Sequence, residues 1–447
     1  MRDDKIKIKL FESPQNFEVL SSSDGCAQAV FKGKIINEEG LEYSPIYVTV
    51  TDETDGTYIV PMSEIKIEAD NNFSVTIEDI PVGGPYTIDF VMLDKEKCLR
   101  NLLSGDKVHH LFVGDVFLIA GQSNAAGRGR GFVYDAPELG VSVLRNLEKW
   151  DVATSVFADE LDSNMFLTFA KDIRRKTGVP VGLIPAAACD SPLSRWLLSE
   201  DGDLYKQAVS AIKDKKIKGV LWYQGCRDAG DGVDMEKYLN RFAELVSDLR
   251  RDLNTPNLPF FTFQLNRQRR RDIIDALEKN YDGIREAQRR AAKSIENVTV
   301  LPTVDALNMS DFIHNSKASN IMLGSRLSVC VLKKLYNRGL GVATPEISLA
   351  KVVSERVVQL CFDNVTEFLS DLNASFDEYP VVIEDSLGVA PIEEAIISGS
   401  TLKIFLKREL KLPAFASGQI GTSPKNLIID YGTGVPMLCF SKFPIEN

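Results

Sequence analysis

The sequence contains few residues of the kinds that build metal or redox centres. Its 447 residues include only three histidines, His109, His110 and His314, and no H-E-x-x-H motif, so a histidine-rich metal site is excluded. The seven cysteines are widely scattered and no C-x-x-C pair occurs, which argues against a zinc ribbon or a dithiol redox pair. A mechanism that needs a catalytic histidine therefore has very few candidates.

The sequence also lacks a long hydrophobic run and an excess of basic residues. No stretch of about 18 apolar residues occurs, so we expect no membrane-spanning helix. The formal charge of −11 is unsuited to binding phosphate backbones, and nucleic acid is not an expected partner. No apolar segment follows the charged residues 1–5, so no signal peptide is visible and we expect a cytoplasmic protein; removal of a leader would instead indicate secretion or a periplasmic location.

The composition is typical of a folded, soluble protein with several domains. Hydrophobic residues make up 44% of the chain and charged residues 26%, so the chain can form a core and is not expected to be disordered. At about 150 residues per domain, the length suggests roughly three domains.

The pattern of apolar residues changes near positions 113 and 343. Short β-branched and aromatic segments separated by turn signals predict strands before 113 and after 343. Between these positions, expected strands at 116–120, 181–185, 219–223, 259–265 and 298–304 alternate with expected helices at 164–176, 235–253, 282–295 and 321–335. This alternation predicts an α/β domain with a parallel sheet covered on both faces. We therefore expect a β-sandwich-like domain over 1–112, the α/β domain over 113–342 and a C-terminal β-rich domain over 343–447.

Polar residues follow the expected strands at the edge where open α/β sheets bind ligands. The residues after successive strands include Ser123, Cys189 and Asp190, Gln224, and finally Asp311 and His314. A serine, a glutamine and an Asp-x-x-His motif on one sheet edge provide the groups that acyl transfer requires.

Ser123, Asp311 and His314 fit the requirements of nucleophilic catalysis. A serine hydroxyl needs an imidazole to accept its proton, and the imidazole needs a carboxylate to hold the right tautomer. Asp311 and His314 lie three residues apart, so one loop supplies both groups. A helix is expected after His314, with Asn315 or Ser316 as its N-cap. Its N-terminus disfavours the protonated imidazole and keeps His314 available as a base.

Amide groups beside this triad are candidates for the oxyanion hole. Gln224 offers a side-chain amide, and the backbone N–H groups of Ser123 and around Cys189 and Asp190 offer further donors. Each feature alone also has a structural explanation: a serine after a strand is usually a turn residue, an Asp-x-x-His motif often caps a surface helix, and Gln224 can satisfy backbone groups at a strand end. Their order along one sheet edge favours the catalytic interpretation.

Two glycine patterns near Ser123 are typical of other folds. The Gly-x-Gly-x-Gly pattern at 127–131 resembles a dinucleotide loop, but such a loop directly follows its strand, whereas residues 123 and 124 intervene here. The Gly-x-Ser-x-Ala pattern at 121–125 resembles the nucleophile elbow of α/β-hydrolases, but that fold places its acid and its histidine on separate loops.

Several segments together resemble the sialate O-acetylesterase-type branch of the SGNH (GDSL-like) hydrolases. They are residues 114–117 (GDVF), 121–124 (GQSN), 221–225 (LWYQG), 284–288 (IREAQ) and Asp311-x-x-His314 with Lys317 and residues 324–326 (GSR). The resemblance covers most of residues 113–335, and the flanking β-domains match multidomain members in layout more than in motif.

The resemblance implies a flavodoxin-like three-layer α/β domain that hydrolyses acetyl esters on carbohydrate through an acyl-enzyme, with a Ser-His-Asp triad and neither a cofactor nor a metal. Ser123 matches the nucleophile of the family, His314 the base and Asp311 its partner.

The resemblance also gives candidate residues for binding the oxyanion or the substrate. Gln224 matches a polar residue expected to help bind the oxyanion, and Cys189, Asp190 and Asn124 are the further candidates at this position of the site.

Two segments depart from the family pattern. Residues 189–191 (CDS) replace a Gly-Gly-Thr-like segment, and residues 224–226 (QGC) stand where the family usually has Gln-Gly-Glu. The first departure places a side chain near the oxyanion, and the second removes a carboxylate from the pocket. Because the Asp190 carboxylate would oppose the oxyanion, we expect it to point away or to pair with a cation such as Arg195.

These departures leave a second interpretation open beside an esterase acting on an acetylated carbohydrate, namely a weakened or inactive carbohydrate-binding protein on the same scaffold. A lipase or thioesterase of the same superfamily ranks lower because no long apolar lid segment is evident. Arg128 and Arg130 are candidates to meet the carboxylate of a sialic acid, although a solvent-facing glycine-rich loop explains them more simply.

Overall fold

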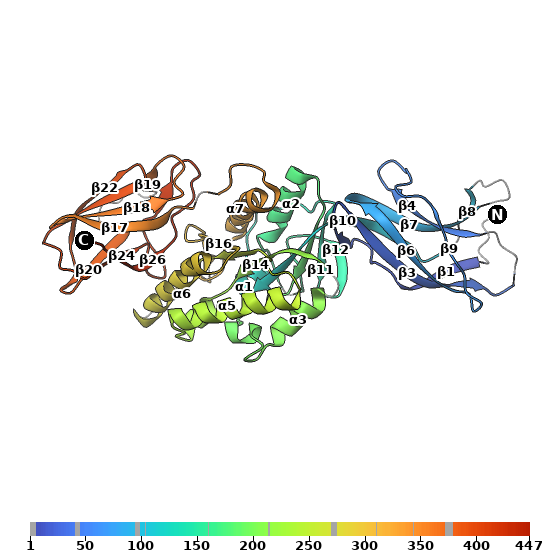
Figure 1. The fold of residues 1–447 in the computed structure, drawn as a ribbon, viewed down its shortest axis with the longest axis horizontal. Helices are drawn as coiled ribbons and strands as arrows, with labels where there is room; N and C mark the ends of the chain where they lie inside the picture. The colour runs from blue at the N-terminus through green and yellow to red at the C-terminus, as the bar shows by residue number, and fades with distance from the viewer. Residues whose placement is uncertain are drawn as a thin grey trace.

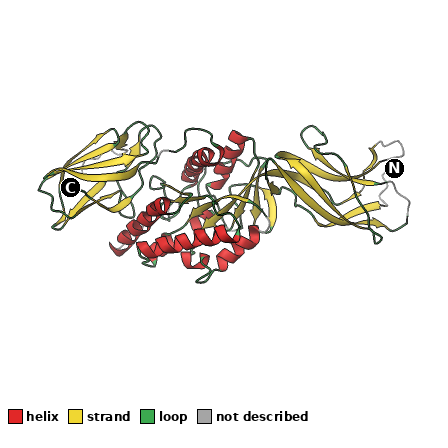
Figure 2. Cartoon of the chain, in the orientation of Figure 1, coloured by secondary structure: helices red, strands yellow, loops and turns green. Residues whose placement is uncertain are grey.

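The computed structural model describes the chain except residues 1–5, 41–44, 94–98, 103, 160, 213–214, 270–274, 310, 343 and 372–378. Figure 1 and Figure 2 show helices in the middle of the molecule, where they cover a sheet, and regions of strands and loops at the two ends. The described residues thus form a β-region, an α/β region and a second β-region in chain order, which confirms the expected fold class.

Two sheets face each other in the N-terminal region. Its strands are β1 (Ile6–Glu12), β2 (Val19–Ser21), β3 (Cys26–Asn37), β4 (Ile46–Asp52), β5 (Ser63–Glu64), β6 (Asn72–Pro81), β7 (Gly83–Leu93), β8 (Leu99–Leu102) and β9 (Ser104–Gly105). One sheet has the order β6-β3-β1-β9, and β4 and β7 lie in the other. Side chains of both sheets share one buried cluster, in which Phe90 packs against Phe31 and Phe73, as in a β-sandwich.

The long strand β10 (Val108–Gly121) joins the N-terminal region to the α/β region. Its first half pairs with β7 and β2, and its second half pairs with β13 (Val181–Pro185) and β14 (Ile217–Tyr223). The boundary expected near residue 113 therefore falls inside a continuous strand. Because Ser123 follows the end of β10, the N-terminal sheet and the candidate site share this strand.

The central sheet has the order β12-β11-β13-β10-β14-β15-β16. Its remaining strands are β11 (Val141–Arg145), β12 (Lys149–Val152), β15 (Phe260–Phe263) and β16 (Val298–Leu301). The pairs from β11 to β16 are parallel, whereas the edge strand β12 is antiparallel to β11. The sheet is thus mixed where a parallel sheet was expected. Strands β13, β10, β14, β15 and β16 have the flavodoxin-like order 2-1-3-4-5, which places ligand sites at the carboxyl ends near β10.

Helices cover both faces of this sheet (Figure 1). They are α1 (Ser123–Ala126), α2 (Phe166–Thr177), α3 (Asp203–Ile212), α4 (Cys226–Gly230), α5 (Met235–Asp252), α6 (Asp275–Ser294) and α7 (Lys317–Tyr336), with a short 3₁₀ turn at Leu193–Trp196. Residues of α2 and α7 share a core with Phe117 and Ile119 of β10, and residues of α3, α5 and α6 share another with Val116 and Leu118. Both faces of the strand are therefore buried, as in doubly wound sheets.

Local signals in the sequence explain several helix ends. Helix α2 ends at Gly178, which has a φ of 79° and donates its N–H to the carbonyl of Arg174, as expected for a glycine cap. The side chain of Ser316 caps α7 by accepting the N–H of Ser319. Helices α6 and α7 begin at Asp275 and Lys317, earlier than expected, because their first turns are largely polar. None of the described helices is both long and apolar enough to cross a membrane.

The C-terminal region consists of strands packed around one core. They are β17 (Glu346–Ser354), β18 (Val357–Asp363), β19 (Leu369–Asp371), β20 (Val381–Asp385), β21 (Gly388–Val389), β22 (Ile392–Ser398), β23 (Thr401–Leu406), β24 (Ala414–Gly418), β25 (Ile428–Asp430) and β26 (Phe440–Pro444). Two antiparallel sheets, β17-β18-β23-β22 and β21-β20-β24-β26, contribute to this core.

Polar contacts fasten the C-terminal region to α6. Glu278 accepts the backbone N–H and the hydroxyl of Thr422, and Asp282 accepts the N–H of Gly421 at 2.7 Å. The guanidinium of Arg285 donates to the carbonyls of Gly421 and Leu265. One helix therefore holds both the C-terminal region and the loop after β15.

Asp282 should make the stability of this contact depend on pH. Asp282 keeps some solvent contact, but desolvation raises the pKa of its carboxyl to about 6 against the opposing effects of Arg285 and the Gly421 N–H. Because the pKa is higher in the folded protein than in the unfolded chain, protonation of Asp282 stabilises the fold. This contribution to the free energy of unfolding is complete below about pH 4 and is lost as the pH rises through about 6. Asp282→Asn, which retains an acceptor for Gly421, should therefore unfold at a higher temperature than wild type at pH 8.

The control for this prediction is the same pair of proteins at pH 4. The difference in melting temperature should largely disappear there, because the wild-type carboxyl is then mostly protonated in the folded state. A difference that does not change between pH 4 and pH 8 would contradict the raised pKa.

Candidate active site

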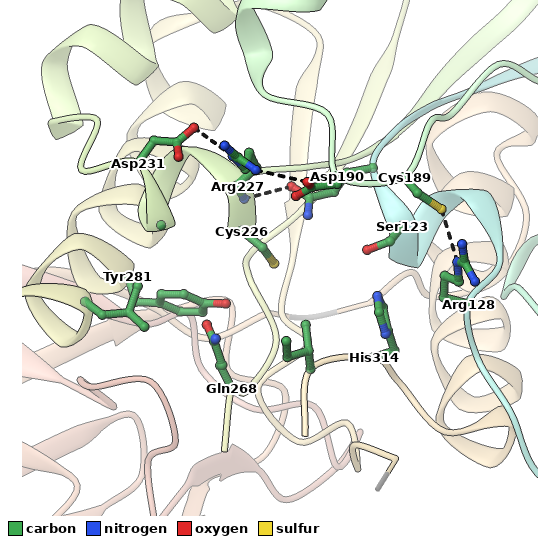
Figure 3. Close-up of a pocket in the computed structure, with 14 residues that line it drawn as sticks. Ser123, Arg128, Cys189, Asp190, Cys226, Arg227, Asp231, Gln268, Tyr281 and His314 are labelled. Atoms are coloured by element: carbon green, nitrogen blue, oxygen red, sulfur yellow. Dashed lines mark hydrogen bonds and ion pairs between the residues drawn. The ribbon is translucent and has the colours of Figure 1, made fainter. Parts of the chain in front are cut away.

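A cavity of about 750 Å³ lies at the carboxyl ends of the parallel strands. Segments that follow each strand of the flavodoxin-like set contribute to its wall (Figure 3). They supply Gln122 and Ser123 after β10, Cys189 and Asp190 after β13, Cys226 and Arg227 after β14, Gln268 and Tyr281 after β15, and Ile313 and His314 after β16. The fold thus brings together residues that are nearly 200 positions apart in the sequence.

The turn that carries Ser123 depends on a close backbone contact. Gly121 has a φ of 123°, and a Cβ atom at this position would lie 2.2 Å from the carbonyl oxygen of Tyr223. Only glycine fits such a position without strain. The chain then enters α1 with Ser123 as its first residue, so the hydroxyl is held at the end of β10.

The neighbours of Ser123 bind two other loops of the site. The side-chain oxygen of Gln122 accepts the N–H of Gly225 at 2.9 Å. The side-chain oxygen of Asn124 accepts the N–H of Asn315, next to His314, at 3.1 Å. Asn124 is 4% exposed and does not line the cavity, which corrects the expectation that it contacts the oxyanion or the substrate.

His314 and Asp311 form the expected pair. The Nδ1 atom of His314 lies 2.7 Å from Oδ2 of Asp311, and Oδ1 accepts the N–H groups of Ile313 and His314. Burial raises the pKa of the Asp311 carboxyl, but the hydrogen bonds from the His314 ring and from the two N–H groups lower it further, so the pKa lies below its usual value. Asp311 is therefore ionised at neutral pH and can hold the His314 ring with Nε2 directed away from it.

Ser123 and His314 face the same space (Figure 3). The described contacts include no hydrogen bond between their side chains. In ligand-free active sites such contacts are often long and tighten when substrate binds.

Asp190 adopts a backbone conformation that favours glycine, with a φ of 53°, which aspartate tolerates better than most residues. Its side chain is 75% exposed and pairs with Arg227 at 2.9 Å. Arg195 instead pairs with Asp203. The expectation of a cation beside Asp190 is therefore correct, but the suggested partner Arg195 is wrong, because Arg195 lies within the 3₁₀ turn and its guanidinium is bound to Asp203 at the start of α3.

Three residues of the cavity wall have backbone N–H groups that are candidates to bind a ligand. Those of Ser123, Cys189 and Asp190 donate to no acceptor among the described residues. The turn that carries Cys189 and Asp190 is held by the buried hydroxyl of Ser191, which donates to the carbonyl of Ala188 at 2.8 Å and lies 3.2 Å from the carbonyl oxygen of Gly121.

Gln224 lies behind the cavity and not in it. Its side chain is fully buried, and its amide nitrogen donates to the carbonyl of Ser191 and to the carboxylate of Asp228. Its side-chain oxygen accepts the hydroxyl of Tyr238. Because these contacts engage the amide, the expected role of Gln224 as an oxyanion donor is wrong, and the residue instead supports the turn after β13.

The sequence placed Cys226 at the pocket, and the structure confirms this, but the sequence did not reveal Tyr281 and Gln268, which also line the cavity. Desolvation raises the pKa of the Cys226 thiol to about 11, so this side chain is neutral. The fully buried Tyr281 hydroxyl lies beside the thiol without a hydrogen bond of ordinary geometry. Tyr281 lies one helical turn before Arg285, whose guanidinium is 5.5 Å from the centre of its ring, but no local pattern marked it as a pocket residue.

The two arginines after Ser123 lie in different places. Arg128 lines the cavity and its Nε lies 3.3 Å from the sulfur of Cys189. Arg130 pairs with Asp162 at 2.7 Å and lies outside this cavity. Among the described residues, no three histidine, cysteine, aspartate or glutamate side chains are grouped so that they can hold a metal ion.

Comparison with known proteins identifies the α/β region. Residues 113–333 match the family of carbohydrate esterases described as sialic acid-specific acetylesterases (SASA). The α/β region of this chain belongs to that family. A probable carbohydrate esterase of Arabidopsis thaliana is 27% identical over 247 residues, which are 48% of this chain and 90% of that protein.

Solved structures resemble the esterase region and its flanks. The crystal structure of a novel carbohydrate acetylesterase from Xanthomonas citri has a TM-score of 0.67 and 19% identity, over 95% of this chain and 97% of that one. An X-ray structure of a protein from Arabidopsis thaliana has a TM-score of 0.43 and 26% identity, over 50% of this chain and 99% of that one. The first comparison shows that the three-part fold extends beyond the family match.

Gly121→Ala should test the backbone contact that positions Ser123 in the esterase region. The new Cβ would meet the Tyr223 carbonyl at 2.2 Å with φ at 123°, so we expect the free energy of unfolding to fall by about 3 kcal/mol or more. Gly178→Ala is the matched control, because its φ is also positive but no atom lies within 4 Å of the new Cβ. It should cost about 1–2 kcal/mol. Equal losses in urea unfolding would show that the contact with Tyr223 does not constrain the turn.

Proposed function

We propose that the protein is a carbohydrate O-acetylesterase that works through an acetyl-enzyme. The observation that carries the proposal is the convergence of Ser123, the hydrogen-bonded pair of His314 and Asp311, and unengaged N–H groups at one cavity. The family of the α/β region supports an acetylated sugar as the substrate.

In the first half of the reaction, His314 accepts the proton of Ser123 at Nε2 while the serine oxygen attacks the acetyl carbonyl carbon. The negative charge that forms on the carbonyl oxygen is bound by backbone N–H groups of Ser123, Cys189 and Asp190. The bond to the sugar oxygen then breaks, and His314 returns the proton to that oxygen, which leaves as the sugar hydroxyl.

In the second half, His314 takes a proton from water as the water oxygen attacks the acetyl group on Ser123. The bond to the serine oxygen breaks, the serine regains the proton from His314, and acetic acid leaves and ionises to acetate in water. Asp311 stays ionised throughout and stabilises the protonated imidazole.

Asp190 stands where the family usually has a small residue, and its carboxylate would repel the oxyanion. Its pairing with Arg227 weakens this repulsion. The carboxylate is 75% exposed and bound to the guanidinium, so water and Arg227 screen its charge. The backbone N–H of Asp190 remains usable whatever the side chain is.

A carbohydrate-binding protein on the same scaffold is the second candidate, and the altered residues at 189–191 and 226 are what favour it. A lipase or thioesterase is the third candidate.

The hypothesis that an arginine binds the carboxylate of a sialic acid now depends on Arg128 alone, since Arg130 lies outside the cavity. Equal rates on O-acetyl sialic acid and on neutral acetylated xylo-oligosaccharides would remove that idea.

Ser123→Ala should lower kcat/KM by about 10⁴-fold or more, because the nucleophile is lost while the cavity stays intact. The measurement is hydrolysis of 4-nitrophenyl acetate together with acetate release from a panel of acetylated glycans. Ser348→Ala, at an exposed position on β17, is the control and should behave as wild type. A silent wild type would support the binding protein, and rates that rise with acyl length beyond acetyl would support the lipase or thioesterase.

His314→Ala should remove most of the activity on the same substrates, because the serine hydroxyl then has no base. If His314→Ala matched wild type on an acetyl ester, the triad assignment would be wrong.

Cys226→Glu should change kcat/KM by less than about tenfold. If Asp311 alone orients His314, the carboxylate that the family usually has at this position is dispensable. The loss of an essential contact in an active site typically changes the rate by more than tenfold. Cys226→Ser controls for the loss of the thiol. An increase well beyond tenfold in Cys226→Glu would show that the missing carboxylate limits catalysis.

A further inference from the structure

A second cavity, of about 660 Å³, adjoins the proposed catalytic cavity. The same two segments line both: Arg128 and His314 face the first cavity, whereas residues 129–132 and Asp311 face the second. The N–H of Lys317 donates to the carbonyl of Arg130 at 2.9 Å, and both residues line the second cavity, so the two segments are joined at its wall. Because His314 lines the first cavity and Asp311 lines the second, a molecule in the second cavity lies on the Asp311 side of this pair.

The second cavity carries an aromatic ring that the protein leaves uncovered. Phe132 lines it and is fully exposed, and Tyr134 on the same loop is 79% exposed. Met309 and Val156 add apolar surface to the wall. Exposed apolar groups that gather at a depression are typical of a ligand-binding surface.

The rest of the lining is polar and includes charges of both signs. Arg130 and Asp162 form an exposed ion pair there, and Lys317 and Ser316 lie on the adjoining segment. Asp311 also faces this cavity, and its side chain is 41% exposed. An acyl chain would bury these charged groups against hydrocarbon at a cost. A sugar instead offers hydroxyl groups to the polar side and a C–H face to the aromatic ring.

We propose that the second cavity is a subsite for the sugar residues next to the acetylated one, so that the enzyme prefers oligosaccharides to monosaccharides. Phe132 stacks on a sugar ring there, and the polar rim binds its hydroxyls. The occupant also covers Asp311 and removes it from water, which strengthens the interaction of its carboxylate with the His314 ring. This inference rests on the proposed esterase function and adds a preference for chain length.

The test compares kcat/KM on chemically acetylated xylo- and cello-oligosaccharides of one to four residues, with 4-nitrophenyl acetate as a substrate that cannot reach the subsite. In wild type, the ratio of kcat/KM for the tetrasaccharide to that for the monosaccharide should be about tenfold in at least one series, the size expected of one aromatic contact. Phe132→Ala should bring this ratio near one, and Phe132→Tyr should retain it because the ring remains. Phe11→Ala is the matched control, since Phe11 is also an exposed aromatic (64%) but lies on β1.

The outcomes separate the two proposals. Activity on 4-nitrophenyl acetate that depends on Ser123, with a flat chain-length profile in both series, would overturn the subsite and leave the esterase standing. A chain-length preference that survives in Phe132→Ala would also overturn the subsite. A folded wild type without activity on any of these substrates would overturn the esterase proposal and the inference that rests on it.

Discussion

The close approach of Gly121 to the carbonyl of Tyr223 is the constraint on which the site depends. It fixes how the ends of β10 and β14 meet, because no side chain fits between them. The turn that follows places Ser123 at the edge of the sheet, and its neighbours then tie in two more loops, Gln122 to the start of α4 and Asn124 to the chain beside His314. The candidate nucleophile is thus positioned by backbone and buried polar contacts before any substrate arrives, which is the preorganisation that catalysis requires.

The far wall of the cavity depends in the same way on the C-terminal region. No residue described in that region lines the cavity. However, the N–H of Gln268 donates to the carbonyl of Thr422, and Arg285 holds Gly421 while it lies over the ring of Tyr281. Without the C-terminal contact, the Gln268 N–H and one N–H of Arg285 would lose their acceptors, whereas Arg285 would keep the carbonyls of Leu265 and Asn266. The wall would therefore lose part of its support.

Charge is distributed so that little negative charge faces the candidate oxyanion position. The Cys226 thiol is neutral, and Asp190 is directed outward to Arg227. Asp228 is fully buried behind the wall, where desolvation raises the pKa of its carboxyl above the usual value, and it accepts hydrogen bonds from Gln224 and from the Leu193 N–H. Asp311 is the carboxylate that contacts the imidazole, which is the arrangement a serine hydrolase needs.

The sequence by itself determined the alternation of strands and helices, the order β, α/β, β and the segments that meet at the carboxyl edge of the sheet. These features follow from local periodicity and from the rule that parallel strands share one active edge. It also determined the contact between Asp311 and His314, because three residues of loop bring them together. Tertiary structure alone decided which groups enter the cavity. Gln224 and Asn124 follow strands as the pattern requires, yet buried partners draw their side chains away, whereas Tyr281 reaches the cavity from α6. Asp190 pairs with Arg227 and not with Arg195, although Arg195 is nearer in the sequence. The direction of a side chain depends on packing between elements that are distant along the chain.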